Sequence, residues 1–448
     1  MVYNIQLMIT KMRSFLYGKI ISYTSFFLFL INSVYAQDET LTISGVIKSS
    51  SDSVGIAYAH VYVPENFVGT VANELGQFEL KVPIVVSQIQ VSSVGYKTLS
   101  INLNKESLSQ FQIYLDEAIY QLNEVVVSAN NFDSALYFFD RAFQSIKLNY
   151  PSKPHLMEGF FRELSLKDTL YTRLIEASVL VQEEGYNKQY FKHRTLEETK
   201  SRVRVTELRK SDDFREYDWF NKALTFFFGQ RNELYMLLRN NYVRLFDTKV
   251  RDYLMSYNNL KVVDWEYVGK SEWEGKIVYI ISATIPQVFR KEKITFYINQ
   301  KDYAFVKIEH TGLPDATWKG DKSLLINNKY FDYREVNYRK VTNKYYPTFI
   351  HTIWSAYGAT STIQMDGKGV RQYVDVLYLL TNVYEDDYSK IKWRKADKQN
   401  SDLYEMKSTY NEQFWQNYNT VKLNPLKRNV AELEKQNSLS EQFKKNQK

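Results

Sequence analysis

Residues 41–127 contain a succession of short segments in which apolar and polar residues alternate. The first, residues 41–47, has the period of two that is typical of a strand with one face on a core. Similar segments follow at 58–63, 69–73, 77–82, 89–93, 96–103 and 111–115. Asn73 and Gly76, in the turn before the fourth segment, tolerate the positive φ of a tight hairpin. About seven short strands in such a length predict an antiparallel sandwich.

Several motifs in this segment resemble a known module. They are Ile43-Ser44-Gly45-Val46-Ile47, Ala59-His60-Val61-Tyr62-Val63, Gly69-Thr70, Gly76-Gln77-Phe78, Val94-Gly95-Tyr96-Lys97 and Glu124-Val125-Val126-Val127. In this order they resemble the carboxypeptidase-like regulatory domain, a transthyretin-like sandwich that also precedes the plug of TonB-dependent outer-membrane transporters. The resemblance implies a fold and no activity, because this module is an accessory domain in carboxypeptidases. It does not imply transport, since a predicted helix follows the last motif instead of a plug.

Residues 1–36 have the pattern of a secretion signal. Three basic residues precede a twelve-residue apolar core at 20–31, and Ala36 ends a small-x-small cleavage site before Gln37. The core is too short to cross a bilayer, which takes about 20 residues. Cleavage would reduce the net charge from +7 by three, to +4. We therefore expect an exported protein of the periplasm or the periplasmic face of the outer membrane, whether translation starts at Met1 or Met12.

Composition narrows the chemistry of the mature chain. It contains no cysteine, which excludes disulfides, a thiolate nucleophile and a lipid-anchored N-terminus. Arg202 and Arg204 stand two residues apart in one short segment, which indicates a solvated strand face. No basic stripe in the sequence indicates nucleic-acid binding. The full chain has 36 tyrosines, which suit sheet faces and binding surfaces because the ring buries area while the hydroxyl stays polar.

The rest of the chain predicts an α+β domain at residues 130–390, after a sandwich domain at 38–128. Apolar residues recur at helical spacing over 133–148 and again over 217–257, whereas 160–166 and 170–182 read as strands. Period-two segments return over 260–384 and predict a long antiparallel meander covered by the helices. The tail, residues 391–448, is charged and helical. Its segments 414–418 and 423–426 are expected to dock on the sheet, and the residues after Arg428 to be a solvated helix or disordered.

This second part looks like the half-barrel of periplasmic lipoprotein carriers, in which a curved sheet wraps around helices and holds acyl chains. If the sheet curves in this way, its shared-face residues Phe296, Ile298, Val306 and Ile308 are expected to line an apolar ligand site. The alternative is a filled sheet that binds nothing on this face.

One spacing suggests catalysis. His155 and Glu158 form an H-x-x-E pattern, as in zinc carboxypeptidases, where both residues bind the metal. We interpret His155 instead as an exposed loop histidine beside a solvated Glu158, because Pro151 and Pro154 precede it and a third ligand is not recognisable. No other hydrolase or phosphate-binding motif is present, so neither a metal nor another cofactor is expected.

The favoured hypothesis is a non-enzymatic envelope protein that binds a partner or an apolar ligand at the outer membrane. The sandwich would offer edge strands to a partner. Two alternatives stay open. A glycan-binding module would use exposed aromatic platforms, with Trp265, Trp273, Trp318 and Trp354 as candidates, and a zinc metallopeptidase would use His155 and Glu158. The identity of the ligand or partner and the oligomeric state are open at this point.

Overall fold

The structure is a computed structural model. It describes residues 40–64, 66–103, 110–118, 131–167, 170–186, 202–215, 232–238, 241–245, 263–286, 290–314, 332–355, 372–386, 389–392, 402–407, 410–424, 430 and 433–447. The chain divides into two compact units, residues 1–41 with 82–85 and residues 42–81 with 86–448. Apart from the ends of β1 and β4, the elements below belong to the second unit. The predicted signal, residues 1–36, lies outside the described residues.

The predicted sandwich is present, with seven strands. They are β1 (Thr40–Ser49), β2 (His60–Tyr62), β3 (Gly69–Val71), β4 (Gln77–Pro83), β5 (Gln88–Ser92), β6 (Leu99–Asn102) and β7 (Phe111–Leu115). One sheet has the order β4-β1-β7 and the other β3-β2-β5-β6. The expectation of a purely antiparallel sandwich was wrong, because β1 and β7 run parallel. β7 follows β6 of the opposite sheet, so no hairpin imposes an antiparallel direction on this pair.

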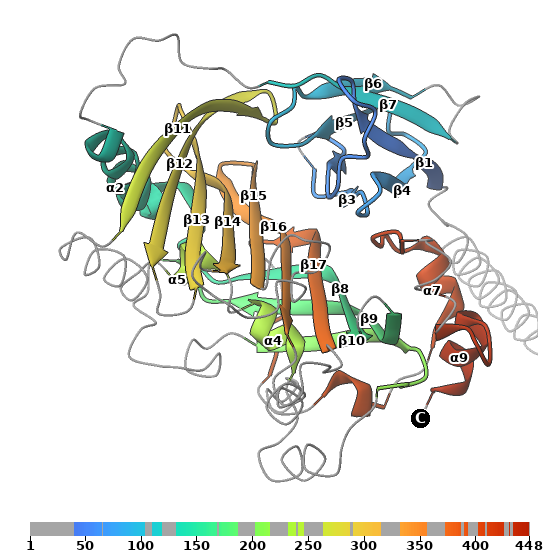
Figure 1. Cartoon of the computed structure of the whole chain (residues 1–448). Helices are drawn as coiled ribbons and strands as arrows, with labels where there is room; N and C mark the ends of the chain where they lie inside the picture. The colour runs from blue at the N-terminus through green and yellow to red at the C-terminus, as the bar shows by residue number, and fades with distance from the viewer. Residues whose placement is uncertain are drawn as a thin grey trace, which may run out of the picture. The chain divides into compact units, whose positions relative to one another are not determined.

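The second part is a ten-stranded antiparallel sheet (Figure 1). Its strands are β8 (His155–Lys167), β9 (Leu170–Glu183), β10 (Arg202–Lys210), β11 (Asp264–Trp273), β12 (Lys276–Pro286), β13 (Arg290–Asn299), β14 (Phe305–Pro314), β15 (Asp332–Val341), β16 (Lys344–Ser355) and β17 (Gln372–Tyr384). Two meanders, β8 to β10 and β11 to β17, join where β17 pairs with β8. The described sheet is open, with β10 and β11 as its edges.

Period-two burial explains why these segments form strands with one face on a core. In β13, Ile294, Phe296 and Ile298 are buried, and the register places Phe296 opposite Ile308 of β14. A bulge between Tyr297 and Ile298 brings Ile298 opposite Phe305. The predicted meander over 260–384 is therefore confirmed, with strand bounds that differ by a few residues.

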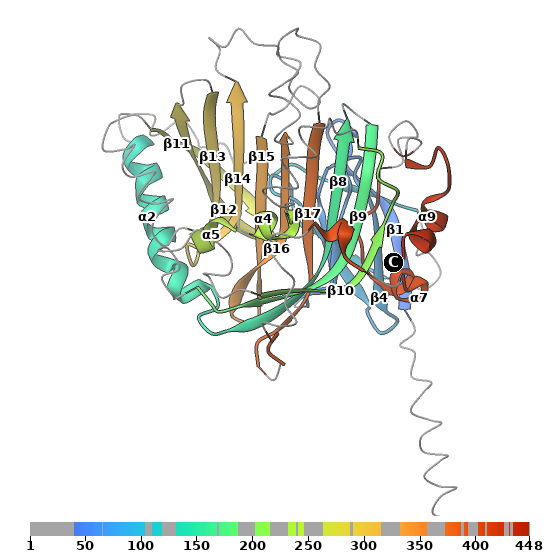
Figure 2. The ribbon, with the colours of Figure 1, turned by 90° about the horizontal axis from the view of Figure 1, so that it is seen from below.

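Helices cover one face of the sheet, which we call the helix face (Figure 2). α2 (Asn131–Asn149) confirms the helix predicted over 133–148 and packs against β11, β12 and β13. Ala135, Phe139 and Ala142 are buried at a spacing of three to four residues, as expected for an amphipathic helix. Of the predicted helical segment 217–257, the structure describes α4 (Glu233–Leu238) and α5 (Tyr242–Leu245). Within the described ranges, no helix is long and apolar enough to span a membrane.

The C-terminal segment contains η3 (Leu403–Glu405), α7 (Glu412–Asn417) and α9 (Leu439–Lys445). Trp415 of α7 packs with Phe160 and Phe349 on the opposite face of the sheet, which we call the tail face, so the expected docking of residues 414–418 is confirmed. The expectation of a solvated segment after Arg428 was wrong. Leu433 and Phe443 are buried in one cluster with apolar residues of β8 and β9. The sequence does not reveal this cluster, because the two apolar residues are isolated in a charged segment.

Candidate functional site

The candidate site is the apolar surface of the helix face. The largest hydrophobic cluster draws residues from all ten strands of the sheet and from α2, α4 and α5. Its members include Phe161 of β8, Ile175 of β9 and Val376 of β17, each with no exposed surface. Because strand residues alternate between faces, a cluster this wide requires apolar residues at every second position of many strands. The sheet therefore presents a continuous apolar surface and not a set of separate patches.

The four residues predicted to line a ligand site lie together in this cluster. Phe296, Ile298, Val306 and Ile308 are each at most 1% exposed. The Phe296 ring centroid lies 5.2 Å from that of Phe139 in α2 and 5.8 Å from that of Phe305. The structure thus confirms that the four side chains share one face and are excluded from water. Their role in ligand binding stays a prediction.

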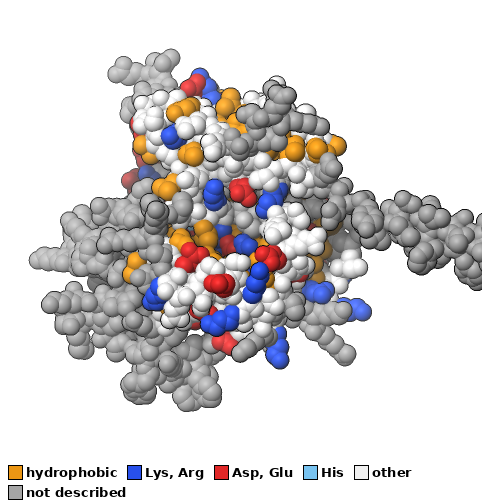
Figure 3. All heavy atoms as spheres, turned by 90° about the vertical axis from the view of Figure 1, so that its right-hand side faces the viewer, with side chains coloured by type: hydrophobic (Ala, Val, Ile, Leu, Met, Phe, Trp, Pro, Cys, Tyr) orange, Lys and Arg blue, Asp and Glu red, His pale blue; other side chains and the backbone are white. Residues whose placement is uncertain are grey.

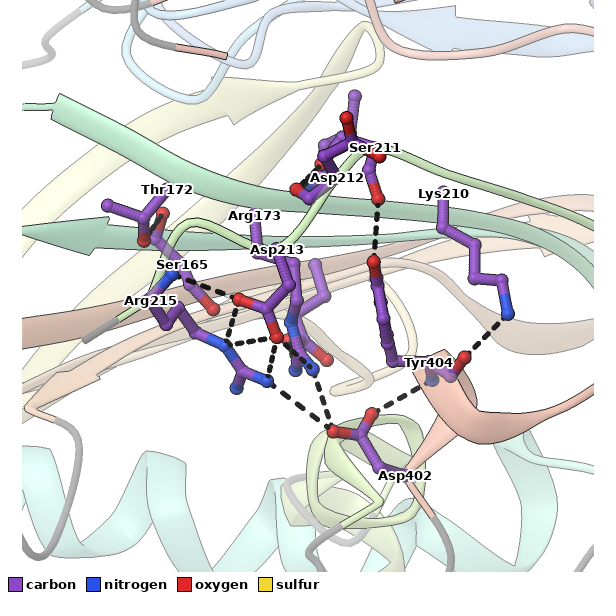
Figure 4. Close-up of polar contacts among 12 residues, drawn as sticks. Ser165, Thr172, Arg173, Lys210, Ser211, Asp212, Asp213, Arg215, Asp402 and Tyr404 are labelled. Atoms are coloured by element: carbon purple, nitrogen blue, oxygen red, sulfur yellow. Dashed lines mark hydrogen bonds and ion pairs between the residues drawn. The ribbon is translucent and has the colours of Figure 1, made fainter. Parts of the chain in front are cut away.

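Charged side chains lie at the β8–β9 end of the same face (Figure 4). Glu163 and Arg173 share the strand parity of Phe161 and Ile175, so they point to the helix face. Arg173 forms ion pairs with Glu163 and, at 2.7 Å, with Asp402. Burial raises the pKa of Glu163, and Arg173 opposes that shift.

Arg215 completes this cluster. Its guanidinium lies 2.6 Å from Asp213 and 3.9 Å from Asp402. Three carboxylates, those of Glu163, Asp213 and Asp402, therefore surround two guanidinium groups in a setting where the Arg173 side chain is only 3% exposed. We call these five residues the Arg173 cluster.

Two buried donors in and next to the Arg173 cluster have no hydrogen-bond partner among the described residues. They are the Nε of Arg173 and the Oγ of Ser165. Ser165 lies directly opposite Arg173 in the β8–β9 register. An unpaired buried donor costs free energy of about 1–3 kcal/mol. Both groups lie on the helix face, at the charged end of the apolar surface.

A second charged group lies on the tail face and fixes the C-terminal segment. Arg162 and Arg209 donate to the two oxygens of Glu176 at 2.7 and 2.6 Å. Burial would raise the pKa of Glu176, but the two guanidinium groups outweigh burial and lower it. The Arg209 guanidinium also lies 4.3 Å from the ring centroid of Trp415, a cation–π contact. This arrangement is structural, because each charged group faces a partner of opposite sign.

The H-x-x-E pattern does not form a metal site. His155 begins β8 and is 1% exposed, so its interpretation as an exposed loop residue was wrong. Its Nδ1 faces the Lys153 carbonyl at 3.1 Å, and burial lowers its pKa. Residues three apart on a strand point to opposite faces, so His155 and Glu158 cannot hold one ion. In the described ranges, no group of three or more histidine or acidic residues is arranged for a metal.

The three later histidines of the chain are engaged elsewhere or not described. His310 contacts Tyr242 and Glu292, and His351 lies 2.9 Å from Asp375. His193 lies outside the described residues.

Two of the four tryptophans proposed as sugar platforms are buried. Trp265 and Trp273 are each 3% exposed. Trp318 and the side chain of Trp354 lie outside the described residues. The glycan hypothesis therefore loses two of its four rings, because stacking on a sugar needs an accessible ring face.

Sequence motifs missed the Arg173 cluster for a clear reason. Alternating charged residues on a strand are normally solvated, and Glu163 and Arg173 carry no motif. The available signal was the spacing of two residues that places Arg173 on the same strand face as three apolar residues, Ile175, Ala177 and Val179. A charged residue at the end of a row of apolar residues on one strand predicts a buried ion pair only when the neighbouring strand, which carries the opposite charge, is known.

The comparisons with known proteins identify the first domain. The family model of the CarboxypepD_reg-like domain matches residues 43–127. No curated protein matches the sequence. The chain therefore contains, at residues 43–127, a CarboxypepD_reg-like domain, as its motifs predicted.

Several solved structures are similar to a part of the chain. A LolA superfamily protein from Nitrosomonas europaea is 9% identical, with 57% of this chain and 94% of that chain covered and a TM-score of 0.19. A domain named for outer membrane lipoprotein sorting, from Vibrio parahaemolyticus, is 5% identical, with 57% and 95% covered and a TM-score of 0.22. Lipoprotein LppX from Mycobacterium tuberculosis is 8% identical, with 58% and 99% covered and a TM-score of 0.20. At these TM-scores the likenesses carry no argument about function.

Proposed function

We propose that the chain is an exported, non-enzymatic binding protein of the cell envelope that holds an apolar ligand on the helix face, with Phe296, Ile298, Val306 and Ile308 in the site. The observation that carries the proposal is the continuous apolar cluster to which all ten strands contribute. Apolar surface removed from water contributes about 25 cal/mol per Å². An acyl chain would therefore be held by area alone, without catalytic groups.

The unpaired donors of Ser165 and Arg173 support a ligand with a polar end. Because three carboxylates and two guanidinium groups already leave the Arg173 cluster one negative charge in excess, an uncharged acceptor such as an ester or amide carbonyl fits better than an anion. The proposed ligand is thus amphipathic, with an acyl chain and an uncharged oxygen acceptor. Export rests on the signal pattern of residues 1–36, which predicts a mature chain beginning at Gln37.

The test is organic extraction of protein purified from its native envelope, with mass spectrometry of the extract. We expect fatty acyl species from the wild type and a lower yield from Ile298→Trp, whose larger side chain would take up part of the proposed site. Val268→Trp is the matched control. Val268 is 49% exposed on β11, so the same substitution there should leave the yield unchanged.

Packing and binding give different results in this experiment. If Ile298→Trp fills a ligand site, its urea midpoint stays close to that of the wild type while the yield falls. An empty wild-type extract, together with a destabilisation of about 1–3 kcal/mol in Ile298→Trp, is what an overpacked core produces. That result would reject the ligand site and leave a structural sheet.

A further inference from the structure

The β4 strand of the sandwich is an edge strand whose backbone is capped by a side chain from the C-terminal segment. β4 is the end strand of the sheet β4-β1-β7, and an edge strand presents unpaired backbone groups. The N–H of Lys81 donates to Oδ1 of Asn419 at 2.7 Å, and Nδ2 of Asn419 donates to the carbonyl of Lys81 at 2.9 Å. This two-way exchange is the one that facing residues make in an antiparallel ladder. The Asn419 amide therefore takes the place of a neighbouring strand.

Further contacts from the sandwich go to the backbone of the same segment. Lys81 Nζ donates to the carbonyl of Tyr418 at 3.2 Å, and Thr70 Oγ1 to that of Thr420 at 3.1 Å. Nδ2 of Asn73 lies 3.4 Å from the carbonyl of Leu423. Tyr418 has an extended backbone, with φ −85° and ψ 138°. The sandwich thus recognises carbonyls of an extended chain, which most sequences can supply.

The segment is held on its other side by the sheet. The Arg162 guanidinium donates to the carbonyl of Val421, and the hydroxyl of Tyr418 accepts from Ser178 at 3.2 Å. Val421 is buried with Val71 of the sandwich and Phe160 of the sheet. Residues 418–424 are therefore bound as a peptide would be, while remaining part of the same chain.

We infer that Thr70, Asn73 and Lys81 form a binding site for an extended strand of a partner protein, and that residues 418–424 occupy this site in the free chain. We call these three residues the β4 edge site. The partner strand would carry an Asn or Gln amide opposite Lys81 and offer backbone carbonyls to Thr70 and Asn73. Strand addition of this kind is a general mode of peptide recognition. The inference does not depend on the apolar ligand, because no β4 residue belongs to the helix-face cluster.

A labelled peptide with the sequence of residues 416–426 tests this site by fluorescence anisotropy on the full chain. The wild type should bind it weakly, because the tethered segment competes at high effective concentration. Asn419→Ala removes two hydrogen bonds of the internal segment and should bind the peptide about tenfold more tightly. Asn417→Ala is the control and should behave as the wild type, since among the described residues the Asn417 amide donates to the Gln413 carbonyl within α7.

Hydrogen exchange at the Lys81 amide locates the binding. We expect faster exchange in Asn419→Ala and restored protection when the peptide is added. A peptide carrying alanine at the position of Asn419 should restore less protection. Equal peptide affinity for all three proteins, or binding that leaves the Lys81 amide unprotected, would overturn the inference. The acyl yield of Asn419→Ala should equal that of the wild type, so failure here is separable from failure of the ligand proposal.

Discussion

Removing Arg173 tests whether the Arg173 cluster is the buried ion network described. Arg173→Met keeps a chain of similar length and deletes the guanidinium that pairs with Glu163 and Asp402. The Glu163 side chain is 2% exposed and that of Asp402 is 9% exposed, so neither carboxylate regains full contact with water. Breaking a buried pair in this way costs about 3–5 kcal/mol. We expect a loss of unfolding free energy at the lower end of this range, because the Arg215 guanidinium remains 3.9 Å from Asp402 and still balances part of its charge.

The cost should come from the carboxylates left behind. Arg173→Met combined with Glu163→Gln and Asp402→Asn removes those charges, and replacing a buried ion pair by neutral groups is often close to neutral. The triple variant should therefore recover more than half of the loss.

Urea unfolding followed by circular dichroism at pH 7 measures both effects, with linear extrapolation to water. Arg204→Met is the matched control, because Arg204 is an exposed residue of the neighbouring strand β10 and should change the free energy by no more than about 0.5 kcal/mol. A loss below about 1 kcal/mol in Arg173→Met, or a triple variant no more stable than the single one, would refute the reasoning.

Two further predictions concern the sheet. Arg162 and Arg209 lower the pKa of Glu176 against the effect of burial. The stability that Glu176 contributes is therefore present above its unfolded pKa of about 4.3 and is lost as the pH falls through the lower folded value. The difference in unfolding free energy between the wild type and Glu176→Gln should shrink as the pH falls below about 4, and a difference independent of pH would contradict the assignment. In Gly159→Ala, the added Cβ would lie 2.4 Å from Cε2 of Tyr378, so urea unfolding should show a loss of about 1–3 kcal/mol; an unchanged midpoint would mean that the Tyr378 ring moves freely.

Local patterns predicted the strands of both domains because strand periodicity is a property of neighbouring residues. Ile294, Phe296 and Ile298 share a face in any register, so their burial followed from sequence. The pairing of β17 with β8 could not be predicted from the sequence, since the two strands are far apart in the chain and no hairpin turn connects them. The β8–β10 meander was therefore not recognised as part of the large sheet.

Charged groups were the least predictable part of the candidate site. Glu163 and Arg173 resemble solvated strand residues until β8 and β9 are paired, and Asp402 reaches them from the C-terminal segment. His155 was misplaced for the opposite reason, because the nearby prolines suggested a loop although the strand begins at that residue. The errors on Glu163, Arg173 and Asp402 thus came from contacts between segments distant in sequence, whereas the error on His155 was local.

The most direct test of the account is the mass of the native protein before and after denaturation. Under native conditions the mass should equal that of the chain beginning at Gln37 plus one acyl species, and under denaturing conditions that of the chain alone. The fraction of molecules that carry this extra mass should fall in Ile298→Trp and stay unchanged in Val268→Trp. Identical native and denatured masses for the wild type would contradict the claim that the helix face binds an apolar ligand.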